Sequence, residues 1–120
     1  MTWQVVLIED DPSVRGFFGL LFSLEPDFDI VGEAASAEQG VEVVRATQPD
    51  LVVLDHHLAG NLTGLDVADD LRAAAPHTRI LLCTALDMNT AAEEHPAIDA
   101  FLSKSRIDAV GEVATTLLRA

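Results

Sequence analysis

Several side chains that could do acid and metal chemistry stand at the ends of short apolar runs in this 120-residue chain. They are Glu9, Asp10, Asp11, Asp55, Thr84 and Lys104, the last being the only lysine. Two carboxylates about 5 Å apart repel by roughly 3 kcal/mol at an effective dielectric of about 20, so a fold that gathers them needs a compensating cation. Oxygen ligands suit Mg²⁺. We therefore interpret Asp10 and Asp55 as a candidate magnesium site, and Asp11 as a solvated acid at a helix N-terminus.

The apolar runs themselves predict a parallel sheet. Residues 5–8, 51–54 and 80–83 are short, rich in branched side chains and apolar without alternation. Strands have this composition when helices cover both faces of a parallel sheet. Residues 28–31 contain a charge and residues 100–103 form a weaker run, so both are predicted to be edge strands.

Helical spacing separates these runs. Pro12 suits the first turn of a helix, and the spacing after it assigns core positions to Val14, Phe17, Phe18, Leu21, Phe22 and Leu24. A capping-box pattern at Ser36 predicts the start of a second helix. Further helices are predicted around residues 65–75 and 110–117. Residues 87–94 form a shorter candidate, because His-Pro follows directly.

These segments make five β–α units at intervals of about 25 residues, with no linker between them. Each parallel connection requires a right-handed crossover. The predicted fold class is therefore α/β, a three-layer doubly wound parallel sheet, with residues 1–120 forming a single domain. Ligands of such folds bind outside the carboxyl ends of the strands, where the polar residues above would gather.

Composition excludes several function classes. The net charge of −13 disfavours a nucleic-acid surface, and a hydrophobic content of 49% excludes intrinsic disorder. No apolar run approaches the roughly 18 residues that a membrane span needs. One cysteine, Cys83, excludes an internal disulfide, and the N-terminus lacks a basic region, so we expect a cytoplasmic protein. The histidines and Cys83 lack the spacing of a zinc site.

Four separated motifs resemble the receiver domain of bacterial two-component response regulators. They are Val5-Val6-Leu7-Ile8-Glu9-Asp10-Asp11-Pro12, Leu51-Val52-Val53-Leu54-Asp55, Thr84-Ala85 and Phe101-Leu102-Ser103-Lys104. The resemblance covers the whole chain, and residues 30–34 and 102–105 are similar to receivers that often precede a helix-turn-helix output domain. It implies a flavodoxin-like sheet of strand order 2-1-3-4-5.

The resemblance also implies roles for individual residues. Asp55 would accept a phosphoryl group from a sensor histidine kinase or a phosphotransfer protein. Asp10 and Asp55 would bind Mg²⁺ directly, Glu9 through a water, and His57 through its backbone carbonyl. Thr84 and Lys104 would contact the phosphoryl group, and Thr84 and Phe101 would form the switch. His57 and Leu86 would flank the path of the hydrolytic water.

The implied output surface is the fourth helix, fifth strand and fifth helix, facing an output protein or an output domain, and a homodimer is another candidate assembly. No turnover of an external substrate is expected.

Three departures from the family pattern concern loops. Ala59 stands where a proline is common, the acceptor loop is one residue longer before Gly64, and Ser105 replaces a proline that often carries a cis bond. The segment from Thr84 to Lys104 is short, which predicts an abbreviated fourth helix.

Other functions remain as alternatives. A receiver-like interaction module that signals without phosphorylation would retain the fold, and the altered acceptor loop keeps this hypothesis open. A phosphatase with an aspartyl nucleophile would need Asp-x-Asp after the first strand, whereas Asp55 follows the third run. A flavodoxin-type nucleotide binder would need a phosphate-cradling loop where Glu9, Asp10 and Asp11 would repel phosphate.

Overall fold

The computed structural model describes residues 2–120 and contains one five-stranded parallel sheet of order β2-β1-β3-β4-β5. The predicted fold class and strand order are therefore confirmed. The strands are β1 (Trp3–Ile8), β2 (Phe28–Ala34), β3 (Leu51–Leu54), β4 (Arg79–Thr84) and β5 (Ala100–Ser103). Every residue of β3 is buried, because helices cover both faces of the sheet.

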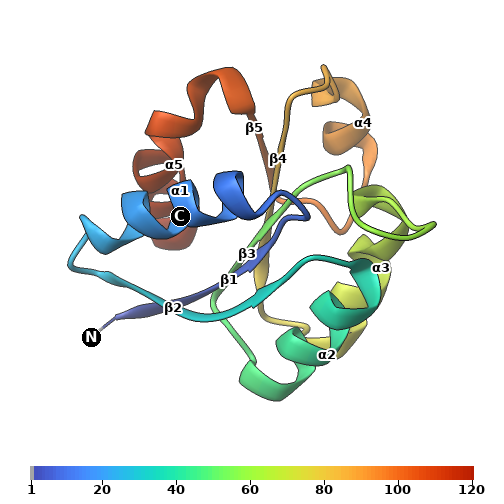
Figure 1. Ribbon diagram of the computed structural model, residues 1–120, viewed down its shortest axis with the longest axis horizontal. Coiled ribbons are helices and arrows are strands. Elements are labelled where there is room, and N and C mark those ends of the chain that lie inside the picture. The colour runs from blue at the N-terminus through green and yellow to red at the C-terminus, as the bar shows by residue number, and fades with distance from the viewer. Residues whose placement is uncertain (1) are drawn as a thin grey trace.

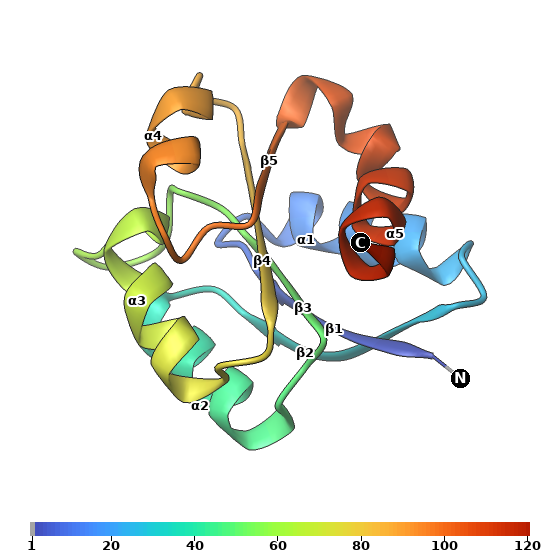
Figure 2. The same ribbon diagram turned by 180° about the vertical axis from the view of Figure 1, so that it is seen from behind.

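Helices lie on both sides of the sheet (Figure 1). α1 (Pro12–Ser23) and α5 (Val110–Arg119) cover one face, and α2 (Ala37–Thr47), α3 (Gly64–Ala74) and α4 (Asn89–Glu94) cover the other, as the reverse view in Figure 2 also shows. A 3₁₀ helix, Lys104–Ala109, joins β5 to α5. Each face thus has its own apolar core, one built around Phe18 and Phe22 and the other around Val67 and Leu71. Within residues 2–120, every helix is too short or too polar to span a bilayer.

Two predictions about helix surfaces were wrong in detail. Phe18 and Phe22 of α1 are buried as expected, but Phe17 is 43% exposed and Leu24, just beyond the helix, is 72% exposed. Residues at i and i+4 lie on one side of a helix, and the sheet contacts only that side of α1. Helical spacing alone admits several such stripes, so it assigned too many residues to the core.

The start of α2 also differs from the predicted capping box. Ser36 accepts a hydrogen bond from the Gln39 N–H at 3.2 Å, but the Gln39 side chain accepts from Ala35 rather than Ser36. A complete capping box instead begins α3, where Thr63 and Asp66 each accept the other's backbone N–H. The Thr-x-x-Asp pattern at this position is the sequence signal for that capping box.

The short fourth helix is confirmed. α4 has six residues and begins without a side-chain cap. Residues 2–120 contain no cis peptide bond, as expected for a loop in which Ser105 follows Lys104.

The start of β5 is anchored by Asp99, whose Oδ2 accepts from Arg72 Nη2 and from the Ile80 N–H, each at 2.8 Å. This anchor fixes the strand that leads to Lys104.

Candidate phosphoacceptor and metal site

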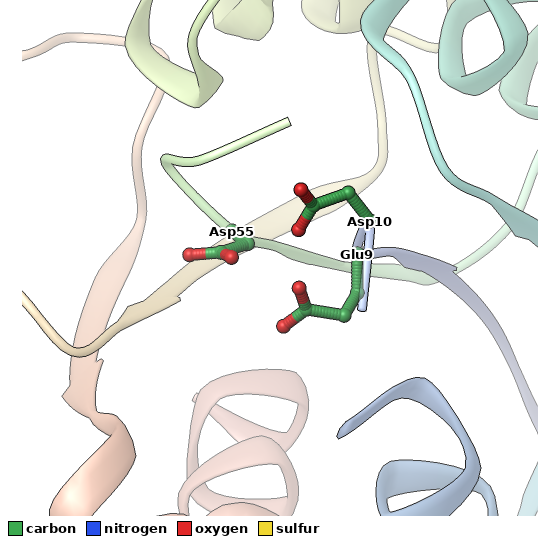
Figure 3. A group of neighbouring side chains, drawn as sticks. All are labelled: Glu9, Asp10 and Asp55. Atoms are coloured by element: carbon green, nitrogen blue, oxygen red, sulfur yellow. The ribbon is translucent and has the colours of Figure 1, made fainter. Parts of the chain in front are cut away.

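Three carboxylates meet where β1 and β3 end. The two strands pair in register up to Ile8 and Leu54, and the Asp55 N–H then donates to the Ile8 carbonyl at 3.0 Å. This places Asp55 beside Glu9 and Asp10, and one oxygen from each carboxylate lies within 4.8 Å of the others. Figure 3 shows Glu9 and Asp10 leaving β1 with their carboxylates turned toward the side on which Asp55 lies.

The three carboxylates differ in their exposure to solvent. Glu9 is 1% exposed and Asp55 is 4% exposed, whereas Asp10 lies on the surface. Within residues 2–120 this is the one cluster of at least three His, Cys, Asp or Glu side chains placed to share an ion, and it contains no histidine. Hard oxygen ligands with an open side toward solvent fit Mg²⁺, which keeps several of its waters.

Lys104 supplies the positive charge that balances the buried acids. Its Nζ lies 2.6 Å from Glu9 Oε1 and donates a hydrogen bond to Asp55 Oδ2 at 2.9 Å. Burial lowers the pKa of Lys104, but the contacts with the Glu9 and Asp55 carboxylates together outweigh it and raise the pKa above its ordinary value. Lys104 is therefore a cation held between two carboxylates.

The site carries more negative charge than one lysine neutralises, because Glu9, Asp10 and Asp55 lie together there. Burial raises the pKa of Glu9 to about 7, with neighbouring Asp55 adding to the effect and Lys104 opposing it. The second carboxylate oxygen of Glu9 accepts from the Asp11 N–H at 3.3 Å. A divalent cation beside Glu9 would favour its ionised form, so the donor set fits a metal ion electrostatically as well as chemically.

Asp11 has a different task, as the sequence predicted. It is the N-cap of α1, and its Oδ1 accepts from the N–H groups of Ser13 and Val14 at 2.8 and 3.4 Å. Arg15, whose role no sequence motif indicates, reaches back from α1 and donates from Nη1 to the Glu9 carbonyl at 2.7 Å. The turn between β1 and α1 is thus held from both ends.

The loop after Asp55 is shaped by backbone contacts. Asp55 Oδ1 accepts from the His56 N–H at 2.8 Å, and the Gly64 N–H donates to the His56 carbonyl at 2.9 Å. A Cβ on Gly64 would overlap the Asp55 carbonyl oxygen, so this approach requires glycine. The Ala59 N–H donates to the Ala35 carbonyl at 3.1 Å, and a proline at position 59 could not make this bond. The substitution for the family's proline therefore ties the loop to the start of α2.

The two histidines of this loop do not point the same way. His57 is exposed, whereas His56 is partly buried, and their rings meet edge to face with centroids 5.8 Å apart. Burial, reinforced by the neighbouring His57, lowers the pKa of His56. The exposed side chain of His57 is compatible with a role limited to its backbone carbonyl.

Thr84 and Phe101 lie on the next two strands. Thr84 ends β4 fully buried, and its Oγ1 accepts from the Leu86 N–H at 3.4 Å, while the Leu86 side chain is 43% exposed. Phe101 is half-buried on β5, opposite Leu82 of β4. It lines a cavity of about 370 Å³ beneath α4, together with Ala92 and Ile98. The structure thus brings Glu9, Asp10 and Asp55 together, with Lys104 in contact with Glu9 and Asp55, and places Thr84 at the end of the neighbouring strand β4.

Comparison with known proteins agrees with this geometry. Residues 5–109 match the model of the response regulator receiver domain family. The nitrate/nitrite response regulator protein NarL of Escherichia coli K12 is 38% identical over 78 residues, which cover 65% of this chain and 36% of that protein. Its homolog in Haemophilus influenzae is 37% identical over 84 residues, or 70% of this chain and 40% of that protein. The matched regions thus span well under half the length of these relatives.

A solved structure has the same fold over nearly the whole chain. The crystal structure of a LuxR-family two-component response regulator from Aurantimonas sp. SI85-9A1 superposes with a TM-score of 0.90 at 27% identity. The superposition covers 99% of this chain and 86% of the other. The sheet order and the arrangement of helices on both faces are therefore those of known response regulators.

Proposed function

The chain belongs to the response regulator receiver domain family of two-component systems, and on that premise we propose that Asp55 accepts a phosphoryl group. The observation that carries the proposal is the pairing of a nearly buried Asp55 with both a carboxylate cluster and the ammonium of Lys104. Phosphoryl transfer depends mainly on positioning and on neutralising charge, and this site offers both.

Mg²⁺ is the metal that the site fits. We propose that Asp10 and Asp55 bind it directly, that Glu9 acts through a coordinated water, and that the His57 carbonyl adds a further oxygen. When bound, the ion supplies positive charge that offsets the phosphoryl oxygens and the carboxylates. The remaining chemistry belongs to the residues of the chain itself.

In the proposed reaction, a carboxylate oxygen of Asp55 attacks the phosphorus of a phosphohistidine on a sensor kinase or phosphotransfer protein. A P–O bond forms, the P–N bond breaks, and the donor imidazole leaves with the electron pair and takes up a proton. Lys104, already 2.9 Å from Asp55 Oδ2, pairs with the transferred group. The Thr84 oxygen accepts from Leu86, so the Thr84 hydroxyl proton is free to bond a phosphoryl oxygen.

Signal reversal uses the same site. Water attacks the phosphorus, the Asp55–phosphate bond breaks, and the carboxylate is regenerated. We propose that the domain assists these two reactions on itself and turns over no external substrate. Phosphorylation would alter the surface formed by α4, β5 and α5, for recognition by an output protein or output domain.

The decisive experiment incubates the protein with acetyl phosphate and reads intact mass with and without Mg²⁺. We expect one added phosphoryl group, only with Mg²⁺ and only when Asp55 is present. Asp55→Asn should remain unmodified, while Asp29→Asn, a change at an exposed residue of β2, should be modified like the wild type. An unmodified wild type under these conditions would favour the alternative, an interaction module that signals without phosphorylation.

A further inference from the structure

The backbone carbonyl of Glu9 lies one residue beyond the end of β1, where the sheet offers it no partner. The groups around it are paired: the Glu9 N–H donates to the Ala34 carbonyl at 2.9 Å, and the Ile8 carbonyl accepts from the Asp55 N–H at 3.0 Å. Arg15 completes the set by donating from Nη1 to the Glu9 carbonyl at 2.7 Å. Carbonyls at the end of a buried strand need such partners.

Arg15 is itself fixed in place. It stands in the first turn of α1, its side chain is 23% exposed, and its Nε lies 3.4 Å from Oε1 of Glu33 on β2. The rigid planar guanidinium thus links α1, β2 and the end of β1. Lysine could satisfy one of these two acceptors with its single ammonium, but it could not reproduce both contacts in one plane.

The carbonyl of Glu9 belongs to the peptide bond that joins Glu9 to Asp10. Because the peptide unit is planar, the direction of this carbonyl also fixes the direction in which the chain enters Asp10. The Glu9 carboxylate is already held by Lys104 and by the Asp11 N–H. The Asp10 side chain, by contrast, is exposed and makes no hydrogen bond or ion pair within residues 2–120, so the backbone aims it.

We propose that Arg15 is a positioning residue that orients the Glu9–Asp10 peptide and so aligns Asp10 to bind Mg²⁺. This inference rests on the proposed function, because it assigns Arg15 to the same metal site. Arg15 does not touch the ion in this role, and it acts through the backbone between the two acidic residues.

The positive charge of Arg15 and its orienting contact have opposite expected effects on the affinity of the site for Mg²⁺. A cation near a metal site repels Mg²⁺, so removal of its charge alone would tighten binding. Loss of an orienting contact would weaken binding, and losses of supporting contacts around metal ligands are typically 10–100-fold in affinity. The sign of the change in Mg²⁺ affinity therefore separates the two roles.

The experiment measures the Mg²⁺ dissociation constant of the full chain by calorimetry and by NMR titration of the Asp10 amide. We expect Arg15→Gln to weaken Mg²⁺ binding about tenfold, and Arg15→Lys to weaken it less. Glu33→Gln removes the ion pair of Arg15 but leaves its contact to the Glu9 carbonyl, so affinity should change by less than about twofold. Arg45→Gln is the matched control, because the Arg45 side chain, among the described residues, pairs with Glu42 alone on the surface of α2.

Two further readouts separate positioning from folding. Thermal unfolding in EDTA verifies that each variant is folded. If Arg15→Gln does not fold, Arg15→Lys replaces it as the test variant. At saturating Mg²⁺, the rate of labelling by acetyl phosphate should return toward that of the wild type. Unchanged or tighter Mg²⁺ binding by a folded Arg15→Gln protein would overturn the inference while leaving the proposed function intact. A wild-type chain that binds no Mg²⁺ would overturn both.

Discussion

The ammonium of Lys104 lies 2.6 Å from a carboxylate oxygen of Glu9, although Glu9 is only 1% exposed. The chain's single lysine therefore neutralises a buried acid as well as Asp55, and it directly follows β5, the strand at the opposite edge of the sheet from β2. One ammonium shared by two buried carboxylates leaves the site short of positive charge.

The first prediction concerns pH. The pKa of Glu9 is raised to about 7 in the folded protein, from 4.5 when unperturbed, so the folded state holds this proton more tightly than the unfolded state. Its contribution to stability is complete below the unfolded pKa and is lost as pH rises through 7. Without metal, the free energy of unfolding should fall by about 3 kcal/mol on this account between about pH 4 and about pH 8.

Urea denaturation of wild type and Glu9→Gln in EDTA measures this effect, because the variant should lack it. The comparison also removes the contribution of His56, whose lowered pKa acts in the opposite direction and costs stability as pH falls. Added Mg²⁺ should flatten the wild-type profile. Parallel pH profiles for the two proteins would show that Glu9 titrates normally.

The second prediction separates Asp10 from its neighbour Asp11. Asp10→Ala should weaken Mg²⁺ binding by at least about tenfold and leave stability almost unchanged. Asp11→Ala should do the reverse, because the α1 N-cap bonds to Ser13 and Val14 are lost at a cost of about 1 kcal/mol. NMR titration and thermal unfolding measure the two effects. Equal Mg²⁺ affinities in both variants would refute the ligand role of Asp10.

The third prediction concerns the loop after Asp55. Ala59→Pro restores the residue common in the family but removes the N–H that bonds the Ala35 carbonyl at 3.1 Å. We expect a loss of about 1 kcal/mol in the free energy of unfolding. Ala59→Ser keeps the N–H and is the control, which should match the wild type. A gain in stability with proline would mean that this bond contributes little.

The fourth prediction concerns the lifetime of the phosphorylated state. Leu86 is 43% exposed beside buried Thr84, where its side chain would shield the phosphoryl group from water. Leu86→Ala should shorten the half-life severalfold, which corresponds to less than about 1.4 kcal/mol in the barrier. Leu62→Ala truncates a similarly exposed leucine of the neighbouring loop and should leave the half-life unchanged. Equal half-lives for both variants would place Leu86 outside the path of water.

The fifth prediction concerns output. If Thr84 turns toward the phosphoryl group, Phe101 gains room to move inward, and its apolar ring favours burial. The cavity of about 370 Å³ beneath α4 gives this region space to rearrange. NMR spectra with beryllofluoride and Mg²⁺ should therefore shift at Phe101 and through α4, and Thr84→Ala should suppress these shifts. Changes confined to the surroundings of Asp55 would mean that the signal leaves by another route.

The sheet and most of the site were predictable from the sequence. The runs at residues 5–8, 51–54 and 80–83 lie inside β1, β3 and β4, because a strand buried on both faces needs an unbroken apolar stretch. Since parallel strands end at one edge, the acids that follow two of these runs had to meet there. The exposure of Phe17 was not predictable in this way, because helical spacing does not say which stripe the sheet covers.

The sequence by itself determined which residues carry charge at the strand ends, and hence the chemistry available to the site. Only the tertiary structure decided how those charges are shared. Lys104 contacts Glu9 as well as Asp55, and Arg15 reaches the Glu9 carbonyl rather than a carboxylate of the cluster. Such contacts depend on the packing of α1, β2 and β5 to within an ångström or so, whereas the local pattern of residues specifies only the order of the elements.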